Sequence, residues 1–106
     1  MSVPGPGVNQ PLNRCSLTAA VVQVQGLRYT PAGIPVINLV LEHESVITEL
    51  DTPRTVKLQI KAVAFGALAE VLARQGLETV CEFHGFLANA RNGKGTAFHI
   101  QDFSKT

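Results

Sequence analysis

The sequence predicts an all-β barrel of five strands, with one short helix between the third and fourth strands. Three observations predict this fold. Apolar and polar residues alternate at a period of two in several segments, as they do in strands that bury one face. Only residues 66–76 have helical spacing. The pair Asn92-Gly93 is typical of the tight turn in a β-hairpin.

The first two strands are separated by a turn. Residues 14–24 are rich in Val, Thr, Leu and Ala, which predicts the first strand. The stretch "TPAG" then has Pro31 at a favoured turn position and Gly33 where a positive φ can be adopted. Pro35 opens "VINLVLEH", the second strand, at a place where a strand tolerates proline.

The third strand has the clearest pattern in the sequence. An acidic loop, "ESVITELDTP", is expected to precede it. In "RTVKLQIKAVA", apolar residues then alternate with polar ones: Val56, Leu58, Ile60 and Ala62 with Thr55, Lys57, Gln59 and Lys61. A strand with one buried and one solvated face is predicted.

The helix and the last two strands complete the pattern. "GALAEVLARQG" has Leu68, Val71 and Leu72 at helical spacing, with Gly76 at the position of a C-cap glycine. "ETVCEFHGFLA" and "TAFHIQDF" predict the fourth and fifth strands. One helix among five strands does not fit a repeating βαβ plan but matches the OB-fold, with an SH3-like or other small α+β barrel as the alternative.

Length and composition predict one globular domain. The chain has 106 residues, of which 45% are hydrophobic and 16% charged. We expect a flexible arm, residues 1–12, before an OB-fold domain, residues 13–106. No apolar stretch approaches the roughly 18 residues that a membrane span needs. The N-terminus has no basic start and no apolar run, so we expect a cytoplasmic protein with Cys15 and Cys81 as free thiols.

The sequence offers no catalytic constellation. His43, His84 and His99 have no evident serine or cysteine partner. Cys81 and His84 have the spacing C-x-x-H, but on a strand such side chains point to opposite faces, and no second pair completes a zinc site. We therefore expect no enzyme, no metal and no cofactor.

The charges suggest a binding surface. The net charge of +1 argues for no partner by itself. In an OB-fold, however, the face of strands two and three and the loops joining strands one–two and four–five form the usual binding surface. The basic residues that map there are Arg28, Arg54, Lys57, Lys61, Arg91 and Lys94. The alternative is an ordinary solvated strand face that carries lysines for solubility.

Aromatic residues that could stack on bases are few. The chain has one Tyr, five Phe and no Trp, and most of the phenylalanines are expected in the core. Tyr29, beside Arg28 in the first connection, is the best candidate for a base contact. The alternative is that its ring packs over the end of the barrel.

Several stretches resemble the bacterial single-stranded DNA-binding protein (SSB) superfamily: "NRCSLTAAVVQ", "RYTPAGIPV", "VAFGALAEV" and "HGFL". The likeness runs from Asn13 to about Phe103. Within it, "GIPVINLVLEHES" and "FHIQDF" are more similar to the family of primosomal replication protein N, PriB. SSB proteins carry a long tail with an acidic tip after the barrel, whereas this sequence ends at Thr106.

The resemblance implies a homodimeric OB-fold that binds single-stranded DNA without sequence preference. It also implies an accessory of the replication-restart primosome, which joins the PriA helicase and, in some bacteria, DnaT. By position, the family's basic DNA contacts fall on Arg28, Arg54 and Arg91, with Lys94 close by. In SSB-like domains the first strands pair across a dimer axis, which would place the interface at residues 17–24.

The sequence also departs from its relatives. Some relatives have aromatic residues in the loop before the third strand and on that strand, and at those positions this sequence has Thr52 and Lys57. A position that is basic in relatives, at the end of the second strand, is Glu44 here. We therefore expect weak stacking and steeply salt-dependent binding through phosphates. Two alternatives stay open. One is a tail-less SSB homologue that protects single strands, and the other is an OB-fold protein-interaction module with incidental DNA binding.

Overall fold

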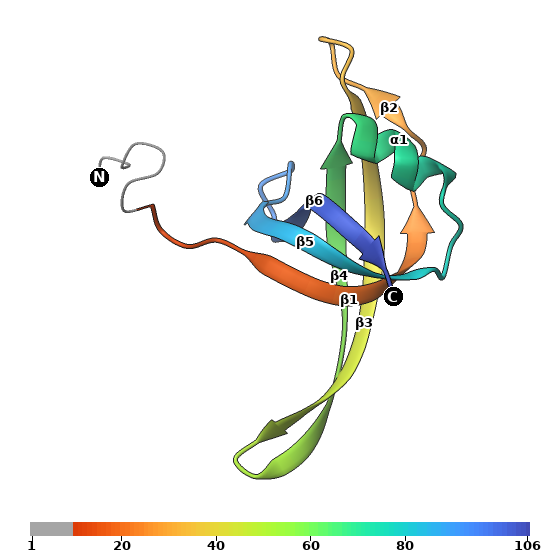
Figure 1. Cartoon of the computed structure of the whole chain (residues 1–106). Coiled ribbons are helices and arrows are strands. Elements are labelled where there is room, and N and C mark those ends of the chain that lie inside the picture. The colour runs from red at the N-terminus through yellow and green to blue at the C-terminus, as the bar shows by residue number, and fades with distance from the viewer. Residues whose placement is uncertain (1–9) are drawn as a thin grey trace.

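The computed structural model describes residues 10–106 and confirms the barrel with its single helix (Figure 1). A two-residue strand, β2 (Arg28–Tyr29), lies in the first connection. The helix, α1 (Ala67–Arg74), follows the third long strand, as the sequence predicts. The five long strands are β1 (Cys15–Val24), β3 (Pro35–Glu49), β4 (Thr52–Phe65), β5 (Val80–Asn89) and β6 (Thr96–Lys105).

The strand β1 closes the barrel because it pairs on two sides. Its first half is antiparallel to β5 and its second half is antiparallel to β3, with a register shift between Val21 and Gln23. The strands β4 and β6 are parallel, and β5 and β6 are antiparallel. The order around the barrel is therefore β1-β3-β4-β6-β5 and back to β1, which is the strand order of an OB-fold.

The core fills the barrel with apolar side chains from all five long strands. Phe83, Phe98, Ile37 and Leu41 are fully buried. The helix packs against β3 and β4 and buries Ala69 and Leu72. The helix ends at Arg74 and its C-cap is Gln75, in an extended conformation, while Gly76 has no positive φ, so the predicted glycine C-cap at Gly76 is wrong.

The predicted acidic loop between the second and third strands is also wrong. Residues 44–49 and 52–53 extend β3 and β4 into a long hairpin that projects from the barrel (Figure 1). The register runs unbroken from Val36 opposite Phe65 to Glu49 opposite Thr52. The turn consists of Leu50 and Asp51, both at positive φ (50° and 62°). Because this turn contains no glycine, the sequence does not show where the second strand ends and where the third begins.

The turns beside the barrel use glycine as predicted. Gly33 has a φ of 86°, and its N–H donates to the Thr30 carbonyl oxygen at 2.8 Å. In the β5–β6 connection, Gly93 and Gly95 have φ values of 75° and 79°. These loops place Arg28 and Arg91 beside the barrel wall.

The barrel begins with an anchored asparagine. The Asn13 Nδ2 donates to the Leu87 carbonyl oxygen at 2.8 Å, and its Oδ1 accepts the Leu87 N–H at 3.0 Å. Most of the predicted arm, residues 1–9, lies outside the described residues, and residues 10–12 are exposed without secondary structure. Within residues 10–106, no helix combines the length and apolar character needed to cross a membrane.

Candidate nucleic-acid interface

Two adjoining hollows lie where β3 and β4 meet the first connection and the β5–β6 loop. We call them together the groove. The amide hollow has a volume of about 630 Å³ and is lined by Gln23, Gln25, Asn38, Leu39, Val40, Lys61, Ala90, Arg91 and Asn92. The aromatic hollow has a volume of about 530 Å³, and its lining includes Arg28, Tyr29, Phe65 and His99. The two share Asn38, Lys61, Ala90 and Arg91.

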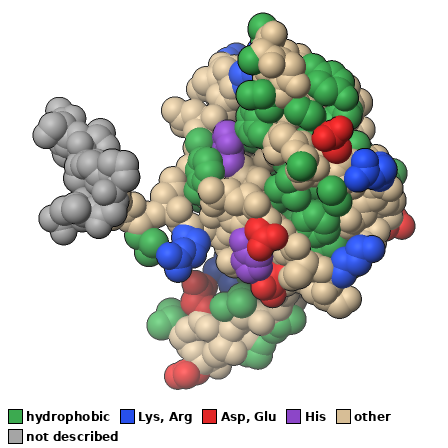
Figure 2. Space-filling model, turned by 45° about the horizontal axis from the view of Figure 1, so that its top comes forward, with side chains coloured by type: hydrophobic (Ala, Val, Ile, Leu, Met, Phe, Trp, Pro, Cys, Tyr) green, Lys and Arg blue, Asp and Glu red, His purple; other side chains and the backbone are tan. Residues whose placement is uncertain are grey.

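The groove brings together four of the seven predicted site residues: Arg28, Tyr29, Lys61 and Arg91. Three of them are cations that come from β2, β4 and the β5–β6 loop. No Asp or Glu is among the residues that line either hollow. The face shown in Figure 2 mixes basic, acidic and hydrophobic side chains. The groove is therefore a local concentration of positive charge on a nearly neutral protein.

Arg28 is held in place by a neighbouring strand. Its Nη2 donates to the Asn38 Oδ1 at 2.9 Å, and the bond is partly buried. The pairing of β2 with β3 sets Arg28 opposite Val36 and Tyr29 opposite Pro35. The Tyr29 ring is 60% exposed and lines the aromatic hollow. The guanidinium is thus preorganised, and the tyrosine ring is open to contact.

An aromatic surface that the sequence analysis missed lies beside Tyr29. The His99 ring stacks on Phe65 with a centroid distance of 5.9 Å and on Phe86 with a centroid distance of 4.8 Å. Phe83 and Phe98 are buried in the core, whereas Phe65 is 48% exposed. The alternation of β4 places Phe65 on the same side as Lys57 and Lys61, but the run "AVAF" is apolar at every position and so gave no sign that its last residue is exposed.

The other three predicted residues lie outside both hollows. Arg54 and Lys57 are on the projecting hairpin, and each has an acidic partner. The Arg54 Nη1 is 2.7 Å from the Glu49 Oε1, and the Lys57 Nζ is 3.4 Å from the Glu44 Oε2. Lys94 is exposed in the β5–β6 loop.

The direction of these side chains also differs. The register of β4 is unbroken, and side chains alternate along a strand. Lys57 and Lys61 therefore share one side of the ribbon, whereas Arg54 lies on the other.

Two histidines do have serine partners, contrary to the expectation from sequence. The His84 Nδ1 is 2.8 Å from the Ser16 Oγ, and its Nε2 is 3.0 Å from the Glu82 Oε1. The His43 Nε2 is 2.8 Å from the Ser45 Oγ. Ser16 lies directly opposite His84 on β1 and β5, a pairing that only the folded register reveals. These groups line neither hollow. The Ser16–His84 pair links β1 to β5, whereas His43 and Ser45 lie on the same strand, and His43 is linked to β1 by its Nδ1, 2.7 Å from the Thr18 carbonyl oxygen.

The described residues hold no metal site. Across residues 10–106, no three His, Cys, Asp or Glu side chains are grouped so that they could bind an ion. Cys15 and Cys81 are free thiols. The groove offers positive charge, amides and aromatic rings, which suit binding rather than acid–base or metal chemistry.

The OB-fold and its basic groove place the chain in the class of SSB-like proteins. Residues 13–102 match a family described as "Another single-strand binding protein family". A solved structure of a deletion mutant of the single-stranded DNA binding protein from Thermus aquaticus has the same fold, with a TM-score of 0.72 at 18% identity. That match covers 90% of this chain and 50% of the Thermus chain.

More similar relatives carry a narrower name. Replication restart protein PriB of Bordetella pertussis is 46% identical over 80 residues, which are 76% of this chain and 75% of the relative. PriB of Neisseria meningitidis serogroup B is 44% identical, over 72% of this chain and 75% of the relative. The solved structure of PriB from Ralstonia solanacearum matches with a TM-score of 0.81 and 38% identity, covering 90% and 98% of the two chains. The chain therefore belongs to the replication restart protein PriB family.

Proposed function

We propose that this protein is an accessory of the replication-restart primosome that binds single-stranded DNA in the groove. One observation carries the proposal: Arg28, Lys61 and Arg91 converge on a groove whose lining contains no acidic residue. The replication-restart role is taken from the names of the PriB relatives. The proposed function is binding alone, with no covalent chemistry.

The cations are proposed to bind the phosphates of the strand. Each phosphate that a Lys or Arg neutralises releases condensed counterions, so affinity falls as salt rises. Three phosphate contacts on a single strand correspond to a slope of about −2 in a plot of log affinity against log salt concentration. Such binding depends on the charge of the phosphate backbone and not on the base sequence.

The aromatic hollow is proposed to stack on bases. Tyr29 and Phe65 are both exposed there, and His99 continues the stack behind Phe65. Base stacking on an aromatic ring contributes roughly 1–3 kcal/mol and tolerates any base. Although the relatives' aromatic positions on the third strand are Thr52 and Lys57 here, a stacking surface is available at the other end of β4.

Arg54, Lys57 and Lys94 are proposed as outer contacts. A phosphate that approaches Arg54 or Lys57 must compete with Glu49 or Glu44. We therefore expect these residues to contribute less than the three cations of the groove, and to matter for longer strands that extend beyond it.

The partners implied by the family belong to the same proposal. We infer a cytoplasmic homodimer that pairs through β1 and docks on the PriA helicase, with DnaT in bacteria that have it. Val46, Ile47 and Leu50 are exposed on the projecting hairpin. These apolar side chains support a protein-interaction role for the hairpin, which keeps open the alternative of an interaction module with incidental DNA binding.

The test is a fluorescence-anisotropy titration with labelled oligo-dT and with a duplex of equal length, at low and moderate salt. We expect preferential binding of the single strand that weakens steeply as salt rises. Absence of binding to oligo-dT at low salt would contradict the proposal and favour the interaction module.

Gel filtration with light scattering tests the assembly. A dimer is expected for a PriB-like protein. A tetramer would favour the tail-less SSB homologue instead.

A further inference from the structure

We propose that the amide hollow receives a nucleobase edge-on and prefers bases that carry a carbonyl oxygen over adenine. This inference rests on the proposed function, because the base would belong to a strand whose backbone lies on the cations of the groove. It goes beyond that function, in which the protein binds the phosphates and stacks on the bases without distinguishing one base from another.

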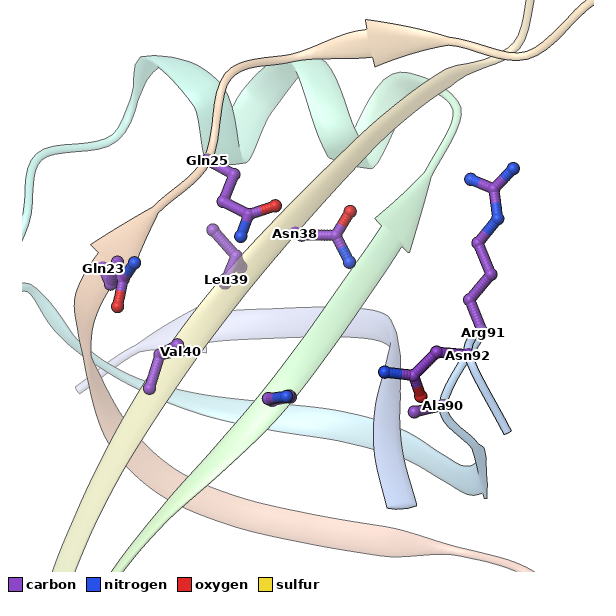
Figure 3. A pocket seen from close by; sticks show the side chains of 9 residues that line it. Gln23, Gln25, Asn38, Leu39, Val40, Ala90, Arg91 and Asn92 are labelled. Atoms are coloured by element: carbon purple, nitrogen blue, oxygen red, sulfur yellow. The ribbon is translucent and has the colours of Figure 1, made fainter. Parts of the chain in front are cut away.

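The hollow has the shape and chemistry of a site for a small planar polar group. Figure 3 shows Gln23 and Gln25 on one side, Arg91 and Asn92 on the other, and Asn38 between them. Its volume of about 630 Å³ lies in the range of ligand-binding clefts, roughly 300–1,000 Å³. Four of its nine lining residues are Asn or Gln, whose amides match the hydrogen-bonding edges of bases.

The polar groups of the hollow offer more donors than acceptors. The Oδ1 of Asn38 accepts from Arg28, which leaves the Asn38 amino group to face a ligand. The Oδ1 of Asn92 accepts the backbone N–H of Lys94. Lys61 and Arg91 can only donate. The Gln23 and Gln25 side chains form no hydrogen bond within residues 10–106, and their amides can turn to present either atom.

This excess of donors distinguishes the bases. Thymine and guanine present the carbonyl oxygens O4 and O6, and cytosine has a carbonyl oxygen at O2. Adenine has no carbonyl oxygen: its acceptors are ring nitrogens such as N7, and its exocyclic group, the N6 amino group, is itself a donor. A donor facing the adenine amino group leaves both groups unpaired, which costs affinity.

The protein-side test compares the affinities for oligo-dT and oligo-dA of equal length, measured by fluorescence anisotropy. We expect the wild type to prefer oligo-dT. Asn38→Asp keeps an oxygen that can accept from Arg28 but replaces the amino donor with an acceptor. We expect it to lower the ratio of dT affinity to dA affinity about tenfold, because a well-aligned base contact discriminates by roughly 1–3 kcal/mol.

The matched control is Asn89→Asp. Asn89 lines the aromatic hollow but not the amide hollow, and the change adds the same negative charge to the groove. It should weaken binding to both oligomers and leave their ratio unchanged. Self-stacking of oligo-dA affects all variants equally, so it cancels in the comparison.

A ligand-side test needs no variant. The wild type should bind an oligo-dT strand with interspersed hypoxanthine more tightly than the same strand with adenine. Hypoxanthine presents the acceptor O6 where adenine presents the N6 amino group, and its N1 carries a hydrogen where the adenine N1 is an acceptor. Equal affinities, together with an Asn38→Asp ratio equal to that of the wild type, would overturn the inference and leave the proposed function standing. Failure of the wild type to bind any of these strands at low salt would instead overturn the proposed function.

Discussion

At the scale of the residue, Lys61 occupies the centre of the groove. Among the described residues it is the only lysine that lines the hollows, and it lines both of them. Within residues 10–106 it has no acidic partner, whereas Arg54 and Lys57 each have one. A phosphate can therefore bind Lys61 without displacing a carboxylate, and this difference separates the groove from the hairpin.

Phe65 tests the stacking part of the proposal. Phe65→Ala should weaken binding of oligo-dT by roughly tenfold, within the 1–3 kcal/mol attributed to one stacked base. The salt slope should stay the same, because no charge is removed. The measurement is an anisotropy titration at several salt concentrations.

The control for this variant is Leu77→Ala, which removes an apolar side chain that is 58% exposed and lines neither hollow. It should leave affinity unchanged. Equal affinity of Phe65→Ala and the wild type would show that bases do not stack there.

At the scale of the element, the projecting hairpin is a ribbon whose own acids neutralise its basic residues. Both ion pairs are well exposed, with side-chain exposures of 58–71%. Exposed pairs contribute little to stability, about 0–1 kcal/mol. Their larger effect is to compete with phosphates for Arg54 and Lys57.

Removing those acids should strengthen DNA binding. The double variant Glu44→Gln with Glu49→Gln is expected to raise the affinity for a long oligo-dT and to steepen its salt slope, because two cations are freed. The free energy of unfolding should change by less than about 1 kcal/mol. Anisotropy titrations and chemical denaturation measure the two quantities.

The matched control is Glu70→Gln with Glu78→Gln, which changes the net charge equally at positions that line neither hollow. An equal gain in both double variants would mean that only net charge matters, and that the hairpin has no part in binding.

The β5–β6 pair depends on a glycine at its irregular point. The register shifts between His84 and Gly85. A Cβ on Gly85 would lie 2.9 Å from the Phe98 Cε1 and inside contact distance of the His99 carbonyl oxygen. Gly85→Ala should therefore destabilise the protein by about 3 kcal/mol, at the upper end of the usual overpacking cost.

Thermal and chemical denaturation check this prediction. Gly26→Ala is the control, because a Cβ there meets nothing within 4 Å. A Gly85→Ala variant as stable as the Gly26→Ala control would contradict the close approach of β5 and β6.

At the scale of the whole molecule, local patterns were enough to predict the barrel. The alternation in β4, the single helical segment and the turns at Gly33 and Gly93 are short-range features, and they predict the order of strands and helix along the chain. That order matches the OB-fold but also left an SH3-like or other small α+β barrel open, and the pairing of the strands around the barrel comes from the structure. The hairpin extension was missed because its turn consists of Leu50 and Asp51, residues that rarely adopt positive φ.

The groove could be predicted only in part. Arg28, Lys61 and Arg91 are far apart in sequence, and barrel closure decides that they meet while Arg54 and Lys57 do not. The ion pairs of the hairpin follow from the long β3–β4 register. Phe65 and His99 lie on the sides of β4 and β6 that alternation places away from the core, but only the folded barrel brings these sides and Tyr29 together in one hollow.

The cations of the groove are proposed to bind the phosphates of the strand. The direct test is the salt dependence of oligo-dT binding by Lys61→Gln with Arg91→Gln, compared with Arg74→Gln with Lys105→Gln. The second pair removes the same charge from exposed positions that line neither hollow. We predict that the groove variant loses affinity and that its salt slope becomes shallower by about 1.4, while the control keeps the wild-type slope. Equal slopes and affinities in the two variants would contradict the account.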